Sequence, residues 1–305
     1  SSDKQIRDGI LALAAGFGTY ATLNMLVNIG NNRYRLIDFW TDTYRAATGS
    51  GALNTLPISV APYAVKFEKR LLVKIMFLAL LFATIQYMFM LGTRTQFAIL
   101  LLIAILAALQ FAYSEQGISG VLKCVGIMAV ISLIAFLLYH FNVLSIRDYI
   151  LSTNLAARYE RRASLENSDS FRFQSFWIGL RELIQYPMGG RASQIYRHNM
   201  WLDVGRVSGI IPFCLLLVYS IKNFANVTAI WKNTKILLSL RYLFLFLYIG
   251  AYVNCFVEPI WEGALNFFLA LCVVDGMVSA MMRRLENDPI PEESVPDTSN
   301  LHTDL

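Results

Sequence analysis

The sequence predicts an all-α membrane protein, a polytopic transmembrane bundle of about eight helices with one long loop. Three observations predict this class. Hydrophobic residues make up 56% of the 305 and charged residues only 15%, whereas soluble chains carry about 25% charged residues. The apolar residues form blocks close to or above the roughly 18 residues that cross a hydrocarbon core. The four cysteines lie inside these blocks without a Cys-x-x-Cys pair, which excludes a disulfide framework or zinc site.

Eight stretches qualify or nearly qualify as spans, at 9–30, 46–65, 75–93, 96–113, 121–141, 204–221, 242–258 and 263–282. The second is the weakest because two glycines and two prolines interrupt it. We expect it to form either a kinked span or a cavity wall. The first is not a cleavable signal peptide, since no soluble domain follows it. The chain begins with Ser1, and we interpret it as a fragment that lacks upstream helices.

Lysine and arginine are distributed differently over the predicted loops. If residues 66–74 are cytoplasmic, both termini and all eight lysines lie on that side, as the positive-inside rule requires. Thirteen of the eighteen arginines fall on the outer side: Arg33, Arg35, Arg45, Arg94, Arg147, Arg158, Arg161, Arg162, Arg172, Arg181, Arg191, Arg197 and Arg206. Arginine holds phosphate through a planar fork of donors. The net charge of +5 therefore indicates a lipid-linked phosphate or diphosphate rather than nucleic acid; the alternative is that outer acids simply pair with these arginines.

The long periplasmic loop is predicted at about 142–203. Its second part has apolar residues at helical spacing and ends at Pro187 and the Gly189–Gly190 pair. We expect an amphipathic interfacial helix there, with Trp177 and Tyr186 at the membrane surface. Packing of the same helix on neighbouring spans is a compatible alternative.

Three kinds of ionisable residue need an interpretation. His198 is the only histidine near the predicted outer surface, and a lone histidine is more often structural than catalytic. No second histidine or Cys/Asp cluster has ligand spacing, so no metal site is expected. Glu258 and Glu262 flank Pro259, where a solvated turn is favoured over an acid–base pair. Asp275 lies within the last span and is either functional or directed toward the cytoplasmic surface.

Two regions follow from the composition. Residues 1–284 form the predicted membrane domain. Residues 285–305 are rich in proline and acidic side chains, and we expect a disordered cytoplasmic tail.

Four stretches in order resemble the bacterial O-antigen ligases and the related O-antigen or polysaccharide polymerases. They are AATGSGAL (46–53), LGTRTQFAILLL (91–102), FRFQSFWIGLRELIQYPMGG (171–190) and YRHNMWLDVGRVSGIIPF (196–213). The second is similar to the family's Thr-Arg motif and the fourth to its His-Asn-x-x-Leu element. The family has a leucine four positions after each motif arginine, and the chain departs from this pattern. Ala98 stands four positions after Arg94, and Phe176 four positions after Arg172. Members of the family usually carry additional N-terminal spans.

The resemblance implies metal-independent glycosyl transfer at the periplasmic face of the bacterial inner membrane, without a cofactor. The donor would be a glycan on undecaprenyl diphosphate, a lipid-linked oligosaccharide or polysaccharide. The acceptor would be lipid A–core in a ligase or another lipid-linked glycan in a polymerase. By matching motif positions, His198 is the expected general base, and Arg94 and Arg172 are the expected diphosphate clamps. The supporting substrate-binding residues would be Arg191, Arg45 and Asn199, the last of which either orients His198 or caps the following helix.

Two alternatives stay open. An Arg-x15-Gly spacing, at Arg33 with Gly49 and at Arg35 with Gly51, slightly favours a polymerase. A polytopic transporter would place ionisable residues at mid-membrane on several spans and break helices in paired halves. Only Asp275 and the interrupted stretch at 46–65 fit that pattern, so the enzyme is favoured.

Overall fold

The computed structural model describes residues 3–30, 35–164 and 168–287, with the backbone alone at 35, 45–48, 159, 161–164 and 168–172. Helices dominate this part of the chain, as predicted. The elements in order are α1 (Asp3–Val27), β1 (Arg35–Ile37), β2 (Tyr44–Ala46), α2 (Ala47–Leu53), α3 (Thr55–Phe67), α4 (Leu71–Leu91), α5 (Arg94–His140), η1 (Val143–Ser145), α6 (Ile146–Ser152), α7 (Asn154–Ser164), α8 (Ser168–Gln185), α9 (Met200–Ser208), α10 (Ile210–Lys232), α11 (Leu238–Val257), α12 (Ile260–Gly263) and α13 (Leu265–Asn287).

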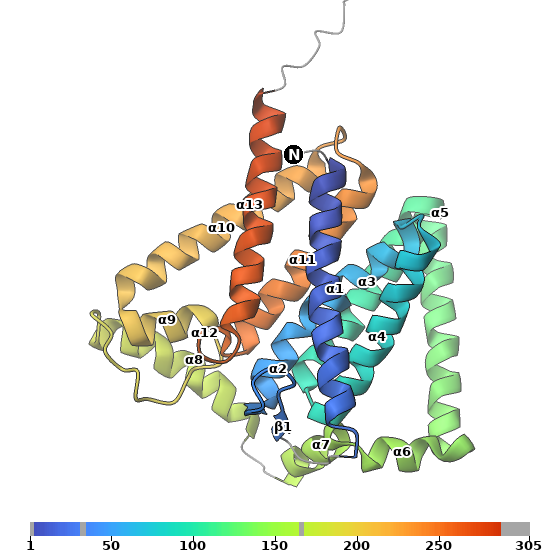
Figure 1. Ribbon diagram of the computed structural model, residues 1–305, viewed down its shortest axis with the longest axis horizontal. Helices are drawn as coiled ribbons and strands as arrows, with labels where there is room; N and C mark the ends of the chain where they lie inside the picture. Colours follow the sequence, from blue (N-terminus) through green and yellow to red (C-terminus); the bar gives the residue numbers. More distant parts are fainter. Residues whose placement is uncertain (1–2, 31–34, 165–167, 288–305) are drawn as a thin grey trace, which may run out of the picture.

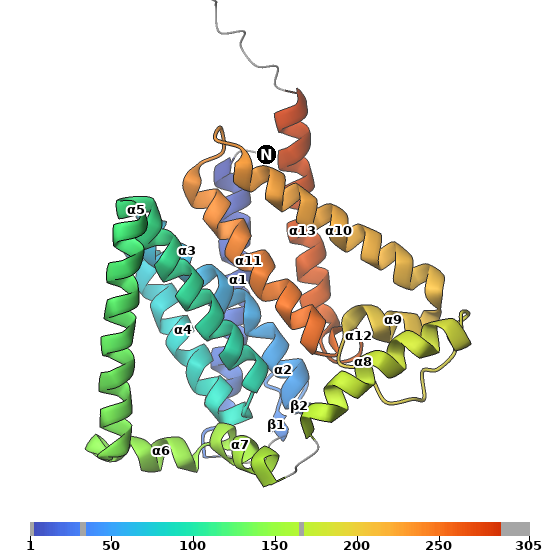
Figure 2. The same ribbon diagram turned by 180° about the vertical axis from the view of Figure 1, so that it is seen from behind.

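Six helices in the described ranges are long and apolar enough to cross a membrane: α1, α4, α5, α10, α11 and α13. Two predicted segments, 96–113 and 121–141, both belong to α5. A straight helix of 47 residues would be about 70 Å long, more than twice the roughly 30 Å hydrocarbon core. The chain instead turns back at Gly117, whose φ of 61° suits a residue without Cβ. Figure 2 shows the second limb of α5 returning to the end at which the first began.

The weakest predicted span, 46–65, forms two short helices that meet at Asn54. Its second helix, α3, packs against α11, α4, α5 and α1. Leu56, Ile58, Val60 and Tyr63 are all buried. The segment tolerates two prolines because neighbouring helices cover the backbone groups that proline leaves without helical hydrogen bonds. Among the described residues, the largest apolar core joins α1, α3, α11 and α13 around Leu56, Val60 and Tyr63, whereas Ile58 packs in a second core with α5 and α11.

The helices end on two levels (Figure 1), which we name by their charged residues. The arginine end contains the β1–β2 hairpin, the start of α5, and α6, α7, α8, α9 and α12. Of the arginines predicted to lie outside, all but Arg33, which lies outside the described residues, belong to this end. The lysine end contains the start of α1, the α3–α4 and α10–α11 turns and the end of α13. The segregation read from the sequence therefore exists in the fold.

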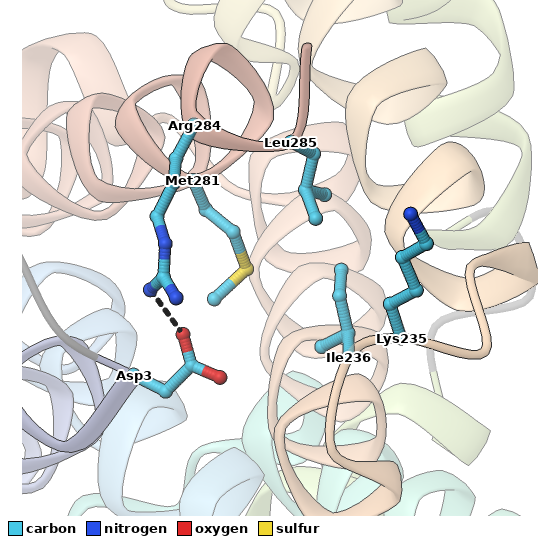
Figure 3. A pocket seen from close by; sticks show the side chains of 6 residues that line it. All are labelled: Asp3, Lys235, Ile236, Met281, Arg284 and Leu285. Carbon is cyan, nitrogen blue, oxygen red and sulfur yellow. Dashed lines mark hydrogen bonds and ion pairs between the residues drawn. The ribbon is translucent and has the colours of Figure 1, made fainter. Parts of the chain in front are cut away.

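A pocket of about 150 Å³ lies at the lysine end, between the start of α1, the α10–α11 turn and the end of α13 (Figure 3). Asp3 and Arg284 form an ion pair of 3.1 Å across it. It is remote from every predicted site residue. Residues 285–287 of the predicted tail continue α13, and the remainder of that tail lies outside the described residues.

The β1–β2 hairpin is a feature that the sequence did not predict. Its two strands are antiparallel, with Leu36 opposite Arg45 and Ile37 opposite Tyr44. Three polar side chains at and just after the end of α1, those of Tyr20, Asn24 and Asn28, bond to it, although all three lie in the predicted span 9–30.

Candidate site at the arginine end

Helix α8 forms where the amphipathic helix was predicted and ends two residues before Pro187. Its apolar residues Phe173, Trp177 and Ile184 are exposed, whereas Ser175 and Glu182 are buried. A helix with its apolar side outward suits apolar surroundings rather than water. Its position in the membrane interface stays a prediction.

The stretches at 171–190 and 196–213 pack closely through glycine. A Cβ on Gly205 of α9 would lie 2.2 Å from Leu183 Cδ2 of α8. Gly209 has φ of 94°, and a Cβ there would lie 2.4 Å from the carbonyl oxygen of Pro187. The amide of Ile210 donates to that same oxygen at 2.8 Å. The glycine at position 209, eleven residues after His198, is therefore explained by sterics, since only a residue without Cβ lets the backbone approach Pro187 this closely.

His198 directly precedes α9 and has the left-handed backbone conformation, with φ of 55°. Its ring meets the Tyr196 ring edge-to-face, with centroids 4.7 Å apart. Such a conformation in a residue other than glycine stores strain on the order of 1–3 kcal/mol and is concentrated at functional sites. The surrounding contacts must therefore hold this residue in place.

Asn199 and Asp203 provide those contacts. Asn199 Oδ1 accepts from the Leu202 amide at 3.1 Å, so the structure shows the capping role for this residue. Asp203 Oδ1 accepts from the Arg197 amide at 2.6 Å, and burial raises the pKa of the Asp203 carboxyl. The two bonds fix the backbone on either side of His198. The sequence showed Asp203 only as an acid able to pair with arginine.

Two of the outer arginines, Arg197 and Arg206, pair with acids as the pairing alternative proposed, and Arg158 bonds a backbone carbonyl oxygen. Arg197 donates from Nε and Nη2 to the Glu182 carboxylate, at 3.0 and 2.6 Å. The Arg206 side chain is completely buried and pairs with Asp203 and Glu262. Arg158 donates to the carbonyl oxygen of Gly92 at 2.9 Å, beside the start of α5. These contacts of the three arginines hold neighbouring elements together.

The predicted arginine ligands occupy other positions. Arg94 is the first residue of α5 and half-buried, at a helix start where the backbone favours anions. The Arg191 guanidinium lies over the Tyr186 ring, 4.2 Å from its centroid. Its Nε is buried and has no hydrogen-bond partner within the part of the chain that the structure describes. Arg172 lies near the start of α8 and Arg45 in β2, and their guanidiniums lie outside the description.

The two earlier stretches, 46–53 and 91–102, also contact each other. A Cβ on Gly51 would lie 2.6 Å from Thr93 Cγ2 and 2.8 Å from Gln96 Oε1. Asn254 of α11 joins the same two stretches. Its Oδ1 accepts from Gln96 Nε2 at 3.1 Å, and its Nδ2 donates to the Ala52 carbonyl oxygen at 3.3 Å.

Residues 254–263, which we call the 254–263 segment, contact all four stretches. Besides Asn254, the Phe256 carbonyl oxygen accepts from Asn199 Nδ2 at 3.2 Å, and the Phe256 ring lies 6.1 Å from that of Phe176. Glu258 accepts from the Thr95 hydroxyl. Glu262 pairs with Arg206, and Gly263 packs against Gly49. The segment is thus the point at which the motifs meet.

Sequence reasoning missed this role of the 254–263 segment. The expectation of a solvated turn is wrong for Glu258, which is 3% exposed. The one available signal was that Asn254 and Glu258 lie four residues apart at the end of an apolar helix, on one face.

Asp275 does not reach toward the cytoplasmic surface. It is buried on α13 and accepts from the Tyr219 hydroxyl of α10 at 2.6 Å and from the Tyr248 hydroxyl of α11. Two hydroxyl donors satisfy this carboxyl within the bundle and join three helices.

No protein-family model matches the chain, and no curated protein matches it. The family resemblance therefore depends on the four stretches themselves. Among the residues with described placement, no three His, Cys, Asp or Glu side chains gather as metal ligands do.

Proposed function

We propose that this protein transfers a glycan from undecaprenyl diphosphate to an acceptor hydroxyl, as an O-antigen ligase does with lipid A–core. The observation that carries the proposal is the convergence of the four stretches on the 254–263 segment. Asn199, next to His198, contacts Phe256, and Thr95, next to Arg94, contacts Glu258. The expected base and the expected diphosphate ligand therefore flank the same end of α11.

Three arginines at this end, Arg94, Arg172 and Arg191, suit the donor's diphosphate. Arg94 combines its own charge with the amides at the start of α5, and Arg191 adds a buried Nε that has no hydrogen-bond partner among the described residues. Arg172, at the start of α8, is the third expected ligand. Guanidiniums fixed in a partly dry site stabilise charge more strongly than they would in water.

The reaction needs one proton acceptor and one leaving group. His198 accepts the proton of the acceptor hydroxyl, and the hydroxyl oxygen forms a bond to the anomeric carbon. The bond from that carbon to the diphosphate oxygen breaks, and undecaprenyl diphosphate leaves with the electron pair. The arginines stabilise this developing negative charge. Attack opposite the leaving group inverts the anomeric carbon.

The distribution of lysine supports the orientation. Lysines gather at the end opposite the site, and cytoplasmic loops carry the excess of positive charge in inner-membrane proteins. The arginine end is accordingly periplasmic in this proposal, where lipid-linked glycans and lipid A–core would meet the site.

A complementation assay of surface polysaccharide tests the proposal. In the full-length protein, His198→Gln should lower glycan transfer by about 100-fold or more, the usual contribution of a general base. His140→Gln is the matched control, since His140 ends α5 outside the four stretches and its ring contacts those of Phe136 and Phe141. Both variants should reach the membrane at the wild-type level. Wild-type transfer by the His198 variant would exclude the base role.

The glycolipid ladder separates ligase from polymerase. Loss of all long chains from lipid A–core, with lipid-linked polymer still made, identifies a ligase, whereas a single repeat unit left on the core identifies a polymerase. The glycines of the Arg-x15-Gly spacing are explained by packing, since Gly49 and Gly51 contact Gly263 and Thr93.

The transporter alternative is supported by the buried Asp275 and by the break at Asn54 between α2 and α3. Asp275→Asn separates the two classes. A transporter would lose its activity in this variant and keep it in His198→Gln, and the enzyme should show the reverse.

A further inference from the structure

The β1–β2 hairpin is connected to the proposed site through α2. Strand β2 continues directly into α2, where Gly49 packs against Gly263 of α12. Glu262 of α12 in turn pairs with Arg206 of α9, the helix that His198 precedes. Both ribbon views show the hairpin at the arginine end, close to the start of α8.

The tip of the hairpin has an unusually complete set of backbone hydrogen bonds. Asn28 Oδ1 accepts from the Ile37 amide and Asn24 Oδ1 from the Phe39 amide, both at 2.9 Å. Asp38 Oδ1 accepts from the amides of Trp40 and Thr41, at 3.0 and 2.9 Å. The amides of Asp38 and Asp42 donate to carbonyl oxygens within the tip. Every amide from 37 to 42 is therefore bonded, which fixes the loop.

Buried polar side chains fix the tip, and burial of polar groups costs free energy. Tyr20, Asn24 and Asn28 are four residues apart on one face at the end of α1, and both asparagines are buried. Tyr20 donates to Asp38, whose carboxylate is also buried. Buried polar groups are tolerated only with hydrogen-bond partners, and here Tyr20, Asn24 and Asn28 each have at least one partner in the hairpin.

This fixed loop presents aromatic rings outward. Trp40 is 82% exposed and Tyr44 is 63% exposed. The exposed hydroxyls of Thr41 and Thr43 and the exposed Asp42 lie between them in sequence. A flat apolar face beside hydroxyl and carboxylate groups matches a sugar ring, which has C–H bonds on its faces and hydroxyls at its edge.

We propose that the hairpin tip, residues 39–44, binds a pyranose ring of the glycan. Trp40 packs on the face of the ring, and Asp42 with the neighbouring hydroxyls accepts from or donates to the sugar hydroxyls. The choice of a sugar as ligand rests on the proposed function. Insertion into lipid is the less favoured occupant, because the carboxylate of Asp42 would enter hydrocarbon with the tryptophan.

Binding of a soluble glycan tests the site. The probe is the oligosaccharide released from the host's own lipopolysaccharide by mild acid, titrated into the purified full-length protein in detergent. Trp40→Ala should weaken binding about fivefold or more, since stacking on one aromatic ring contributes about 1 kcal/mol. Trp177→Ala, an exposed tryptophan of α8 at the same end, is the matched control and should bind as the wild type does. Equal binding by the wild type and Trp40→Ala would overturn the proposal.

Two further measurements distinguish the outcomes. The first is tryptophan fluorescence in vesicles with brominated acyl chains, where the difference between the wild type and Trp40→Phe gives the emission of Trp40. This emission should not be quenched by the bromine. Quenching would show that Trp40 inserts into lipid and would overturn the proposal. His198→Gln should keep oligosaccharide binding while losing transfer. Absence of glycan transfer by the wild-type protein, with Trp40-dependent binding, would reject the proposed function and leave the sugar site standing.

Discussion

The two ends of the bundle both contain ion pairs, but the pairs differ in burial. At the lysine end, Arg284 pairs with Asp3, and both side chains are substantially exposed. At the arginine end, Arg206 and Asp203 are both completely buried. Exposed pairs contribute about 0–1 kcal/mol to stability, whereas breaking a buried pair costs about 3–5 kcal/mol. The charges of the lysine end suit orientation in the membrane, and those of the arginine end build a scaffold around His198.

The largest expected effect follows from removing the buried charge. Arg206→Ala leaves Asp203 without its cation and removes bonds to two loop carbonyl oxygens. We expect a loss of about 3–5 kcal/mol in the free energy of unfolding. Thermal unfolding in detergent measures it, with Arg284→Ala as the control at the lysine end, expected to lose at most about 1 kcal/mol. Similar losses in both variants would contradict the comparison.

A second prediction concerns backbone packing at the arginine end. Gly49→Ala places a Cβ 2.3 Å from the Gly263 carbonyl oxygen, so a backbone must move. The expected loss of stability is about 1–3 kcal/mol, with a matching loss of glycan transfer. Gly16→Ala in α1 is the control, because no heavy atom lies within 4 Å of its Cβ. An unchanged unfolding temperature for Gly49→Ala would show that α2 and α12 do not pack as described.

A smaller effect is expected at the helix cap beside His198. Asn199→Ala removes the acceptor for the Leu202 amide and should cost about 1 kcal/mol. Asn199→Asp keeps this acceptor but loses the donor to the Phe256 carbonyl oxygen. If the 254–263 segment positions the site, the aspartate variant keeps the stability of the cap and still loses transfer. Wild-type transfer in Asn199→Asp would remove that positioning role.

The smallest effect is a pH dependence at the lysine end. Arg70 donates to the Glu68 carboxylate and lowers the pKa of Glu68 to about 2. Because the folded pKa is below the unfolded value of about 4.3, the stabilisation is present above that pH and is lost as the pH falls toward 2. Glu68→Gln should flatten the fall of the unfolding temperature between pH 5 and pH 3. An unaltered slope would argue against this pair.

The helices and the separation of lysine from arginine could be predicted from sequence because hydropathy and charge are local properties. The turn of α5 at Gly117 and the break at Asn54 were visible only as interruptions. The hairpin was not predictable, because its strands are three residues long and depend on Asn24 and Asn28 of a preceding helix.

The candidate site likewise has residues that could be predicted from the sequence and residues that could not. Motif resemblance predicts His198 and Arg94 as site residues, because their residue types suit the proposed chemistry. Asn254 and Glu258 could not be identified, because their roles depend on Gln96 and Thr95, roughly half the chain away. Burial of Asp203 beside His198 likewise depends on how α8 and α9 pack.

Binding of undecaprenyl diphosphate to the purified full-length protein tests the central claim most directly. Arg94→Gln should weaken binding about tenfold or more, because a hydrogen bond to a charged group contributes about 1.5–3 kcal/mol. Arg284→Gln, at the opposite end, should bind as the wild type does, with both variants unfolding at the wild-type temperature. Equal affinities for the Arg94 variant and the wild type would contradict a diphosphate site at the arginine end.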